Sequence, residues 1–204
     1  IPNWVAYELT AAETEPKFPR QGRFMPDPKV RGASAVTGDY RKSGYDRGHM
    51  APAADMRWDR RAMRESFYLS NVCPQNSNLN RGRWGDLEQD VRRWAKACGA
   101  VYVVCGPIVG RQPLCIGTDQ VAVPDSFFKV LCRRVDSHYQ AIGFIFPNQA
   151  CHAPVASYAL SVDSVEKRTS LDFFSQLPDS IENRIEAVCH PQDWLNYSTA
   201  TLPK

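Results

Sequence analysis

The apolar positions along the chain fall into continuous runs and into stripes that repeat at the helical period. The continuous runs are rich in β-branched and aromatic residues, which favour β-strands. They predict β-strands, and those from residue 101 onward are predicted to form one mixed or antiparallel sheet. We expect these strands at residues 4–9, 44–50, 67–72, 101–105, 119–124, 127–135 and 139–146.

The clearest helical stripe lies between Trp84 and Cys98, where apolar residues recur at steps of three and four. This spacing predicts one helix from near Asn80 to about residue 97. Asn80 and Glu88 are eight residues apart, which is about 80° around an ideal helix. Both side chains can therefore face the same cleft, whereas Glu88 and Arg92, four residues apart, share a face of their own.

Shorter helices are predicted at 60–66, 161–169 and 181–188. We expect the second of these to begin at Asp163, with Glu166 three residues further on completing a capping box. Strands in a sheet with separate helices indicate an α+β fold with a central sheet and flanking helices. With 204 residues the chain has the length of one domain, and we assign residues 1–204 to a single unit.

Residues 11–44 contain no clear element and are rich in Pro, Gly, Lys and Arg. Irregular segments of this length are uncommon unless they are functional, so we expect this arm to lie across the molecule near the site. No run approaches the length of a membrane span, and no membrane partner is expected. The first ten residues lack the pattern of a signal peptide, although a chain that starts on Ile1 leaves room for a trimmed, exported precursor.

Positive charge is concentrated in residues 41–96, which hold twelve Lys or Arg against seven Asp or Glu, a net +5 in a chain of net +3. Such a basic strip indicates a polyanionic partner, of which nucleic acid is the obvious one. One of the four histidines, His49, lies in this strip, within the sequence DRGHMAPAAD.

Seven cysteines are present, and none forms a CxxC pair. We expect buried thiols at Cys73, Cys105 and Cys132, and propose the disulfides Cys98–Cys115 and Cys151–Cys189. Either disulfide would indicate an oxidising compartment, hence a secreted or periplasmic protein, with an organellar or intracellular location as the alternative. A zinc-organised interaction domain built on the dipeptides Cys151-His152 and Cys189-His190 is a third, weaker hypothesis.

Phosphodiester hydrolysis needs a base to activate water, a cation to stabilise the developing charge, and donors that hold the phosphate. Histidine suits the first role because its ordinary pKa lies near neutrality. Gly48, which precedes His49, has no Cβ and allows a close approach of backbone or substrate. Mg²⁺ prefers oxygen ligands and keeps several waters, so very few protein ligands suffice.

The segment DRGHMAPAAD, followed by FYLSNVCPQNSNLNRGRWGDLEQDVRR, resembles the DNA/RNA non-specific endonuclease family, which includes endonuclease G and the sugar-non-specific bacterial nucleases. The spacing is specific: Asn80 comes 31 residues after His49, Glu88 eight residues later and Arg92 four residues after that. The resemblance is dense from Asp46 to Pro107 and looser beyond. It implies a ββα-metal element, in which a β-hairpin carries the histidine and a helix carries the metal ligand.

By position, the resemblance gives each matching residue a role. His49 matches the general base, Asn80 the one direct protein ligand of Mg²⁺, and Glu88 a carboxylate that holds the metal through water. Arg47 and Arg92 match phosphate-binding arginines. Supporting positions fall on Asp46 and Asn71. The family's upstream arginine aligns loosely, and we choose Arg23, with Arg20 as its rival.

Plainer explanations exist for several of these residues. Asn80 could only cap its helix, and Glu88 with Arg92 could be an ordinary surface pair. The buried stripe makes Trp84 and Trp94 core residues rather than platforms for bases. The resemblance implies a nuclease that uses Mg²⁺, or Mn²⁺ as a substitute, on DNA and RNA, and a possible homodimer. A catalytically silent nucleic-acid-binding protein on the same fold is the alternative.

Overall fold

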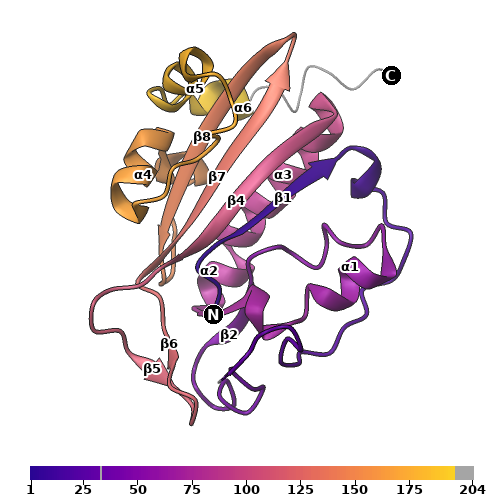
Figure 1. The fold of residues 1–204 in the computed structure, drawn as a ribbon, viewed down its shortest axis with the longest axis vertical. Coiled ribbons are helices and arrows are strands. Elements are labelled where there is room, and N and C mark those ends of the chain that lie inside the picture. The colour runs from indigo at the N-terminus through magenta and orange to yellow at the C-terminus, as the bar shows by residue number, and fades with distance from the viewer. Residues whose placement is uncertain (33, 196–204) are drawn as a thin grey trace.

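A five-stranded sheet forms the centre of the computed structural model, which describes residues 1–32 and 34–195 (Figure 1). Every neighbouring pair of its strands is antiparallel, so the expected central sheet is confirmed. In spatial order the strands are β1 (Val5–Thr10), β4 (Ala100–Ile108), β7 (Ser126–Val135), β8 (His138–Pro147) and β9 (Ala159–Leu160).

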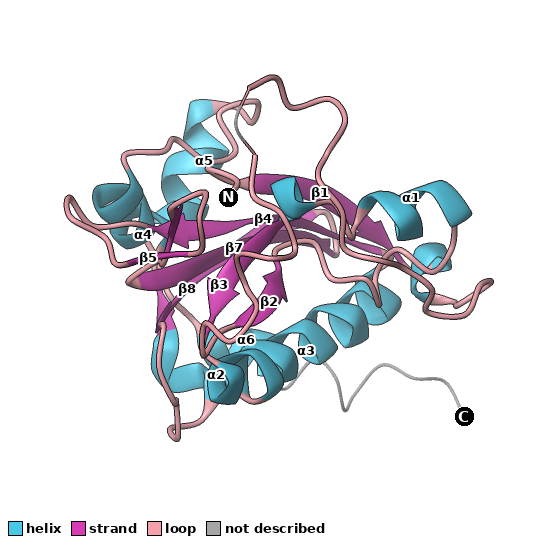
Figure 2. Cartoon of the chain, turned by 90° about the horizontal axis from the view of Figure 1, so that it is seen from below, coloured by secondary structure: helices cyan, strands magenta, loops and turns pink. Residues whose placement is uncertain are grey.

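Helices cover both faces of this sheet (Figure 2). On one face α3 (Arg83–Cys98) packs its apolar stripe, including Trp84 and Trp94, against alternate residues of β4, β7 and β8. On the other face lie α4 (Val162–Thr169) and α5 (Asp179–Glu186), above a second apolar cluster. Both tryptophans are almost completely buried, which confirms them as core residues.

A second, smaller sheet lies beside the first helix layer and holds the DRGH sequence. Strand β2 (Asp46–His49) pairs antiparallel with β3 (Val72–Gln75), so that His49 faces Val72. The chain between these strands includes α1 (Arg60–Glu65), and the chain after β3 enters α2 (Ser77–Arg81) and then α3. This order, two antiparallel strands followed by a helix, is the ββα element that the resemblance implies.

The single helix expected from Asn80 onward is in fact two helices, and this corrects the 80° argument. The backbone breaks at Gly82, whose φ of −101° and ψ of −117° are not helical. A Cβ at Gly82 would lie 2.5 Å from the carbonyl oxygen of Asn78, so the break depends on glycine. Asn80 therefore belongs to α2 and Glu88 to α3, and tertiary structure rather than helical period decides how they face each other.

Two further local predictions were wrong. Residues 67–72 do not form a strand: a 3₁₀ turn, η2 (Leu69–Asn71), occupies half of them, and the strand starts at Val72. Helix α4 is capped by Ser161, whose side chain accepts a hydrogen bond from the Ser164 amide, and not by Asp163. The remaining short elements are η1 (Ala12–Thr14), β5 (Cys115–Ile116), β6 (Val121–Ala122), η3 (Val155–Tyr158) and α6 (Pro191–Leu195).

The irregular arm lies against the small sheet, as expected. The amide of Met25 donates to the Phe67 carbonyl at 3.2 Å, and the Met25 carbonyl accepts from the Leu69 amide at 2.9 Å. The ring of Phe24 lies 5.2 Å, centroid to centroid, from that of His49. The arm thus forms part of the wall around the histidine.

The proposed disulfides are wrong, because all seven cysteines are free thiols. Cys98 ends α3 just before β4 begins, whereas Cys115 lies in β5, beyond the far end of β4 (Figure 1). A nine-residue strand spans roughly 30 Å, far more than the ~6 Å between bridged Cα atoms. The three predicted buried thiols are confirmed at Cys73, Cys105 and Cys132. The argument for an oxidising compartment loses its basis.

A search of the described helices for one long and apolar enough to cross a membrane finds none.

Candidate active site

His49 lies at the end of β2 with its ring enclosed by aromatic residues. The ring centroids of Phe24 and Phe67 lie 5.2 and 4.9 Å from that of His49, and Phe67 meets it edge-on. Only 9% of the residue is exposed, and its Nε2 is buried without a hydrogen-bond partner in the described chain. Burial, with a smaller contribution from the Arg20 guanidinium, lowers the pKa of His49 to about 4. The imidazole is therefore neutral at pH 7, the state in which it can accept a proton.

Gly48 lets β2 approach β3 closely. A Cβ at this position would lie 2.1 Å from Oε1 of Gln75, its diagonal neighbour on β3. Gln75 is itself completely buried, so it has no space into which it could withdraw. The glycine thus serves the packing of the hairpin, which fixes the strand that ends in His49.

Asn80 is attached to the same strand through Asp46. Its Nδ2 donates a hydrogen bond of 2.9 Å to Oδ2 of Asp46, which also accepts from Arg81 and, through Oδ1, from Ser77. This bond leaves the carboxamide oxygen of Asn80 without a donor among the residues that the structure describes. Asn76, not Asn80, caps α2, accepting from the amides of the second and third residues after it. The capping explanation for Asn80 is therefore wrong.

Glu88 belongs to a group of four charged side chains between α3, β7 and the loop after β2. Arg92 pairs with Asp55, its Nη1 lying 2.6 Å from Oδ1, so it is no surface partner of Glu88. Asp55 is fully buried and its other oxygen accepts a 2.8 Å hydrogen bond from the Tyr7 hydroxyl. Lys129 is also fully buried, and its Nζ lies 4.4 Å from the Trp84 ring centroid.

Burial dominates the protonation of the two carboxylates in this group. It raises the pKa of Glu88 to about 7, and the nearby charge of Asp55 adds to the rise, while Lys129 and Arg92 oppose it. Burial likewise raises the pKa of Asp55, against the favourable interactions with Arg92 and Tyr7. Glu88 thus titrates near neutrality, which is typical of functional sites and less common elsewhere.

Arg47 lies under the arm and is the other arginine of the predicted site. Its Nη2 donates to the Thr37 carbonyl at 2.8 Å, and its guanidinium lies 5.5 Å from the ring centroids of both Phe24 and Tyr40. Its Nε is buried and has no partner within the described ranges. Arg47 shares Phe24 with His49, so these two residues lie near one another.

Of the two candidates for the upstream arginine, the structure brings Arg20 toward the histidine. Its guanidinium lies 5.8 Å from the Phe67 ring centroid, and its charge acts on the pKa of His49. Arg23, the residue preferred from the sequence, is exposed and makes no such interaction. Asn71 bridges the loops flanking the hairpin, donating to the Ala51 and Ser66 carbonyls and accepting from the Ala51 amide.

Sequence reasoning missed Asp55 and Lys129, although each left a signal. Asp55 ends the DRGHMAPAAD sequence, and it is buried although the four residues that follow it are only partly buried. Lys129 lies between Phe127 and Leu131 on the inward face of β7. Because successive side chains of a strand point to opposite faces, this position is one where an apolar residue is expected. A lysine at such a position indicates a buried charge that needs a partner.

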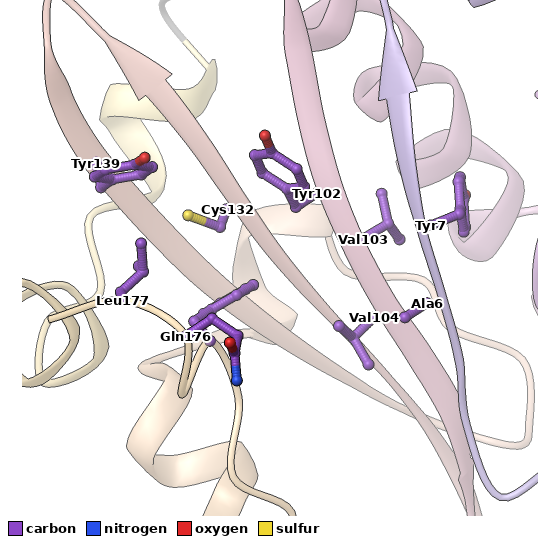
Figure 3. A pocket seen from close by; sticks show the side chains of 10 residues that line it. Ala6, Tyr7, Tyr102, Val103, Val104, Cys132, Tyr139, Gln176 and Leu177 are labelled. Atoms are coloured by element: carbon purple, nitrogen blue, oxygen red, sulfur yellow. The ribbon is translucent and has the colours of Figure 1, made fainter. Parts of the chain in front are cut away.

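Two depressions in the surface differ in character. One, of about 490 Å³, is mainly apolar and lies over β1, β4 and β7 beside residues 174–177 (Figure 3). Apart from Tyr7, none of the residues described in this site lines it. The other, of about 360 Å³, adjoins the site through Arg92. Its basic lining residues are Arg57, Arg92, Arg93 and Lys96.

The donor set around β2 and α2 suits a hard divalent cation. The Asn80 oxygen is fixed in direction by Asp46 and free to coordinate, and the carboxylate of Glu88 lies on the next helix. Oxygen donors of this kind are what Mg²⁺ takes, together with water. By contrast, the Cys-His dipeptides gather no metal-binding group within the part of the chain that is described, which counts against the zinc hypothesis.

Two antiparallel strands, the first of which ends in His49, are followed by helices that carry Asn80 and Glu88, and this is the arrangement of a ββα fold. Comparison with known proteins agrees, because residues 1–180 match the model of the DNA/RNA non-specific endonuclease family. The chain belongs to this family.

Relatives of known name support this assignment. The chain is 37% identical over 193 residues to the mitochondrial nuclease EXOG of Xenopus laevis, covering 86% of this chain and 54% of that protein. It is 36% identical over 152 residues to mitochondrial endonuclease G of Bos taurus, covering 68% and 51% of the two chains. Nuclease C1 of Cunninghamella echinulata var. echinulata is 37% identical over 194 residues, 87% of this chain and 77% of that one.

A solved structure shares the fold. A crystal structure of the EndoG/EndoGI complex matches with a TM-score of 0.82 and 33% identity, over 88% of this chain and 80% of that one. The chain spans about half the length of the mitochondrial relatives named above.

Proposed function

We propose that this chain is a Mg²⁺-dependent nuclease domain that cleaves DNA and RNA without sequence preference, leaving 5′-phosphate and 3′-hydroxyl ends. One observation carries the proposal. Nε2 of His49, at the end of β2, is buried and has no hydrogen-bond partner among the described residues. Asp46, on the same strand, accepts a hydrogen bond from Asn80, whose carboxamide oxygen accepts none within the described chain. A base on a strand and a metal ligand on a helix are thus joined by the hydrogen bond between Asp46 and Asn80.

In this proposal His49 takes a proton from water, and the resulting hydroxide attacks phosphorus in line with the departing 3′ oxygen. The neutral imidazole that burial enforces can accept this proton at pH 7. Arg47 and Arg92 hold the phosphate and neutralise its growing charge. Asp55 and Tyr7 position the Arg92 guanidinium through one nitrogen, which leaves its other N–H groups for the substrate.

A divalent ion would be held by Asn80 directly and by Glu88 through water. When bound, it would supply positive charge that stabilises the pentacovalent phosphorus and the leaving oxygen. Glu88 would hold it best as a carboxylate, so its protonation near pH 7 couples metal binding to pH.

Lack of sequence preference follows from which groups contact the substrate. The proposed site residues meet phosphate and metal, and neither carries sequence information. The neighbouring groove lined by Arg57, Arg93 and Lys96 would extend these contacts along the backbone. With free cysteines and mitochondrial relatives, we propose the organellar alternative for location in place of secretion. The possible homodimer stays a prediction, to be checked by light scattering.

Plasmid nicking with Mg²⁺ and with EDTA tests the activity. We expect cleavage with Mg²⁺ only, and its loss in His49→Ala while binding of DNA persists. His138→Ala is the matched control, because His138 is exposed and lies on the distant strand β8. If the unaltered chain binds DNA with Mg²⁺ but never nicks it, the silent binding protein becomes the better account. Unchanged nicking in His49→Ala would remove the histidine from its proposed role.

A further inference from the structure

Three carboxylates gather on the face of the sheet opposite α3, outside the proposed nuclease site. Asp163 and Glu166 lie on α4, and Glu186 ends α5. One oxygen from each lies within 4.8 Å of the other two. Because Ser161 caps α4, Asp163 is not needed as the cap and is free to take part in this group.

Glu186 gives an independent sign that a positive partner belongs here. Only 4% of the residue is exposed, and its Oε1 is buried without a hydrogen-bond partner in the described structure. A buried carboxylate oxygen left in this way costs free energy that a ligand would recover. Glu166 already accepts a 2.8 Å hydrogen bond from the Phe173 amide through Oε1, which fixes its side chain beside the group.

We propose that Asp163, Glu166 and Glu186 bind a hard divalent cation of the calcium type. Calcium takes oxygen ligands at about 2.3–2.6 Å, so two oxygens on one ion lie up to about 5 Å apart. The three oxygens lie within 4.8 Å of one another, so small side-chain adjustments would let them share one ion. Mg²⁺ demands a stricter octahedral geometry and usually takes only one or two carboxylates, so a set of three suits calcium better. Asp163 and Glu166 are only partly buried, which leaves room for water to complete the shell.

The charges around the three carboxylates favour the binding of a cation. Asp172 and Glu182 lie close enough to act electrostatically on Glu186 and add to the negative potential. Burial, and then these neighbouring carboxylates, raise the pKa of Glu186 to about 8. A proton is therefore the competing occupant when no metal is present, and an experiment must separate the two.

A bound ion would join α4 to α5 where both pack on the sheet. Val162 and Val165 of α4 share an apolar cluster with Ile185 of α5, next to Glu186. The ion would tie the two helices at the edge of this cluster and so stabilise this layer. This role does not depend on the nuclease proposal, because none of the three carboxylates belongs to the site around His49.

Calorimetric titration of calcium tests the site, without nucleic acid. Asn80→Ala serves as the background, because it removes the proposed catalytic ligand and leaves α4 and α5 intact. We expect this variant to bind one Ca²⁺, and to gain about 5–10 °C in Tm at 100 times the Kd. Adding Glu186→Gln should weaken binding at least tenfold. Adding Asp179→Asn instead removes a carboxylate that lies on the same helix but is not one of the three proposed ligands. This change should alter the calcium affinity less than twofold.

Two results would overturn the proposal. One is the absence of saturable binding in Asn80→Ala up to about 1 mM calcium, the weak end for biological sites. The other is equal affinity with and without Glu186→Gln. Gln keeps the shape of Glu, and circular dichroism establishes that each variant is folded. If Glu186→Gln raises the Tm of the metal-free protein and calcium never binds, the occupant of the cluster is a proton.

Discussion

Asp46 and Asn80 are joined by a 2.9 Å hydrogen bond that connects the strand of the proposed base to the helix of the proposed metal ligand. The same carboxylate accepts from Ser77 and from two nitrogens of Arg81, so it is held on several sides. Partial burial acts to raise the pKa of Asp46, but these donors outweigh it and lower the pKa. A carboxylate that stays ionised and accepts several hydrogen bonds orients the Asn80 amide with its nitrogen toward Asp46.

Replacing Asp46 by Asn should therefore impair metal use more than folding. An amide at position 46 offers one acceptor oxygen where the carboxylate offered two. We expect the Mg²⁺ concentration for half-maximal cleavage to rise about tenfold or more, as when groups that support metal ligands are removed. Asp86→Asn, which removes an exposed partner of Arg83, is the control and should have little effect.

The single change Asn80→Asp would place two carboxylates in contact, so its effect on metal preference includes their repulsion. The exchange Asn80→Asp with Asp46→Asn restores a hydrogen bond between the two positions while adding charge to the ligand. We expect it to recover part of the Mg²⁺ affinity lost in Asp46→Asn and to alter the Mg²⁺/Mn²⁺ activity ratio. No recovery, and no change in that ratio, would count against Asn80 as the ligand.

The buried pair of Asp55 and Arg92 gives a second prediction. Asp55→Asn leaves Arg92 without its partner, and breaking such a pair costs about 3–5 kcal/mol. Tyr7→Phe removes one hydrogen bond and should cost only about 1 kcal/mol. Urea unfolding measures both. If Asp55 positions Arg92, kcat/KM must fall in both variants, and it must fall further in Asp55→Asn than in Tyr7→Phe. Equal activity in the two variants would contradict this.

Local patterns predicted the central sheet because its strands depend on short-range signals. Alternating and β-branched runs identified β4, β7 and β8. The spacing from His49 to Arg92 supported the family resemblance, and that resemblance implied the ββα element. The break at Gly82 was not predicted because the helical period of apolar residues does not reveal a backbone conformation in which an added Cβ would collide with the Asn78 carbonyl oxygen.

Partners distant in sequence were not predictable in this way. The Arg92–Asp55 pair joins residues 37 apart and the Tyr7–Asp55 bond residues 48 apart, and neither has a local pattern. The choice between Arg23 and Arg20 could not be made from the sequence, because it depends on the folded arm, in which Arg20 lies over the Phe67 ring. The disulfides failed for a similar reason: polar surroundings indicate exposure but say nothing of which cysteines meet.

The raised pKa of Glu88 predicts that metal binding depends on pH. Below about pH 7 this carboxyl is protonated in the metal-free protein, and binding must release that proton. The apparent Kd for Mn²⁺ should therefore rise nearly tenfold for each pH unit below 7 and level off above it. Calorimetry in buffers of different ionisation enthalpy would count the proton. In Glu88→Gln we expect weaker Mn²⁺ binding, and the rise of the apparent Kd below pH 7 should disappear. An unchanged slope of log Kd against pH would exclude Glu88 as the source of the pH dependence.

The basic groove beside Arg92 predicts how substrate affinity responds to salt. Arg93→Gln and Lys96→Gln each remove one cation from its lining, so each should reduce the slope of log K against log salt by about 1. The loss should appear in KM with kcat nearly unchanged, because neither residue reaches the proposed reacting groups. Arg184→Gln, an exposed arginine on α5, is the matched control. A slope that responds equally to all three changes would mean that DNA is bound without using this groove.

The last prediction separates Arg20 from Arg23. Burial is the larger cause of the low pKa of His49 and the charge of Arg20 the smaller, so removing that charge must let the pKa rise. In the metal-free protein, the His49 ring signals in NMR should titrate at about pH 4, and at a higher pH in Arg20→Gln. Arg23→Gln removes an equal charge from the same arm and should leave the pKa of His49 unchanged. A larger shift in Arg23→Gln than in Arg20→Gln would return the role of the upstream arginine to Arg23, because the residue nearer the imidazole must have the stronger effect on its charge.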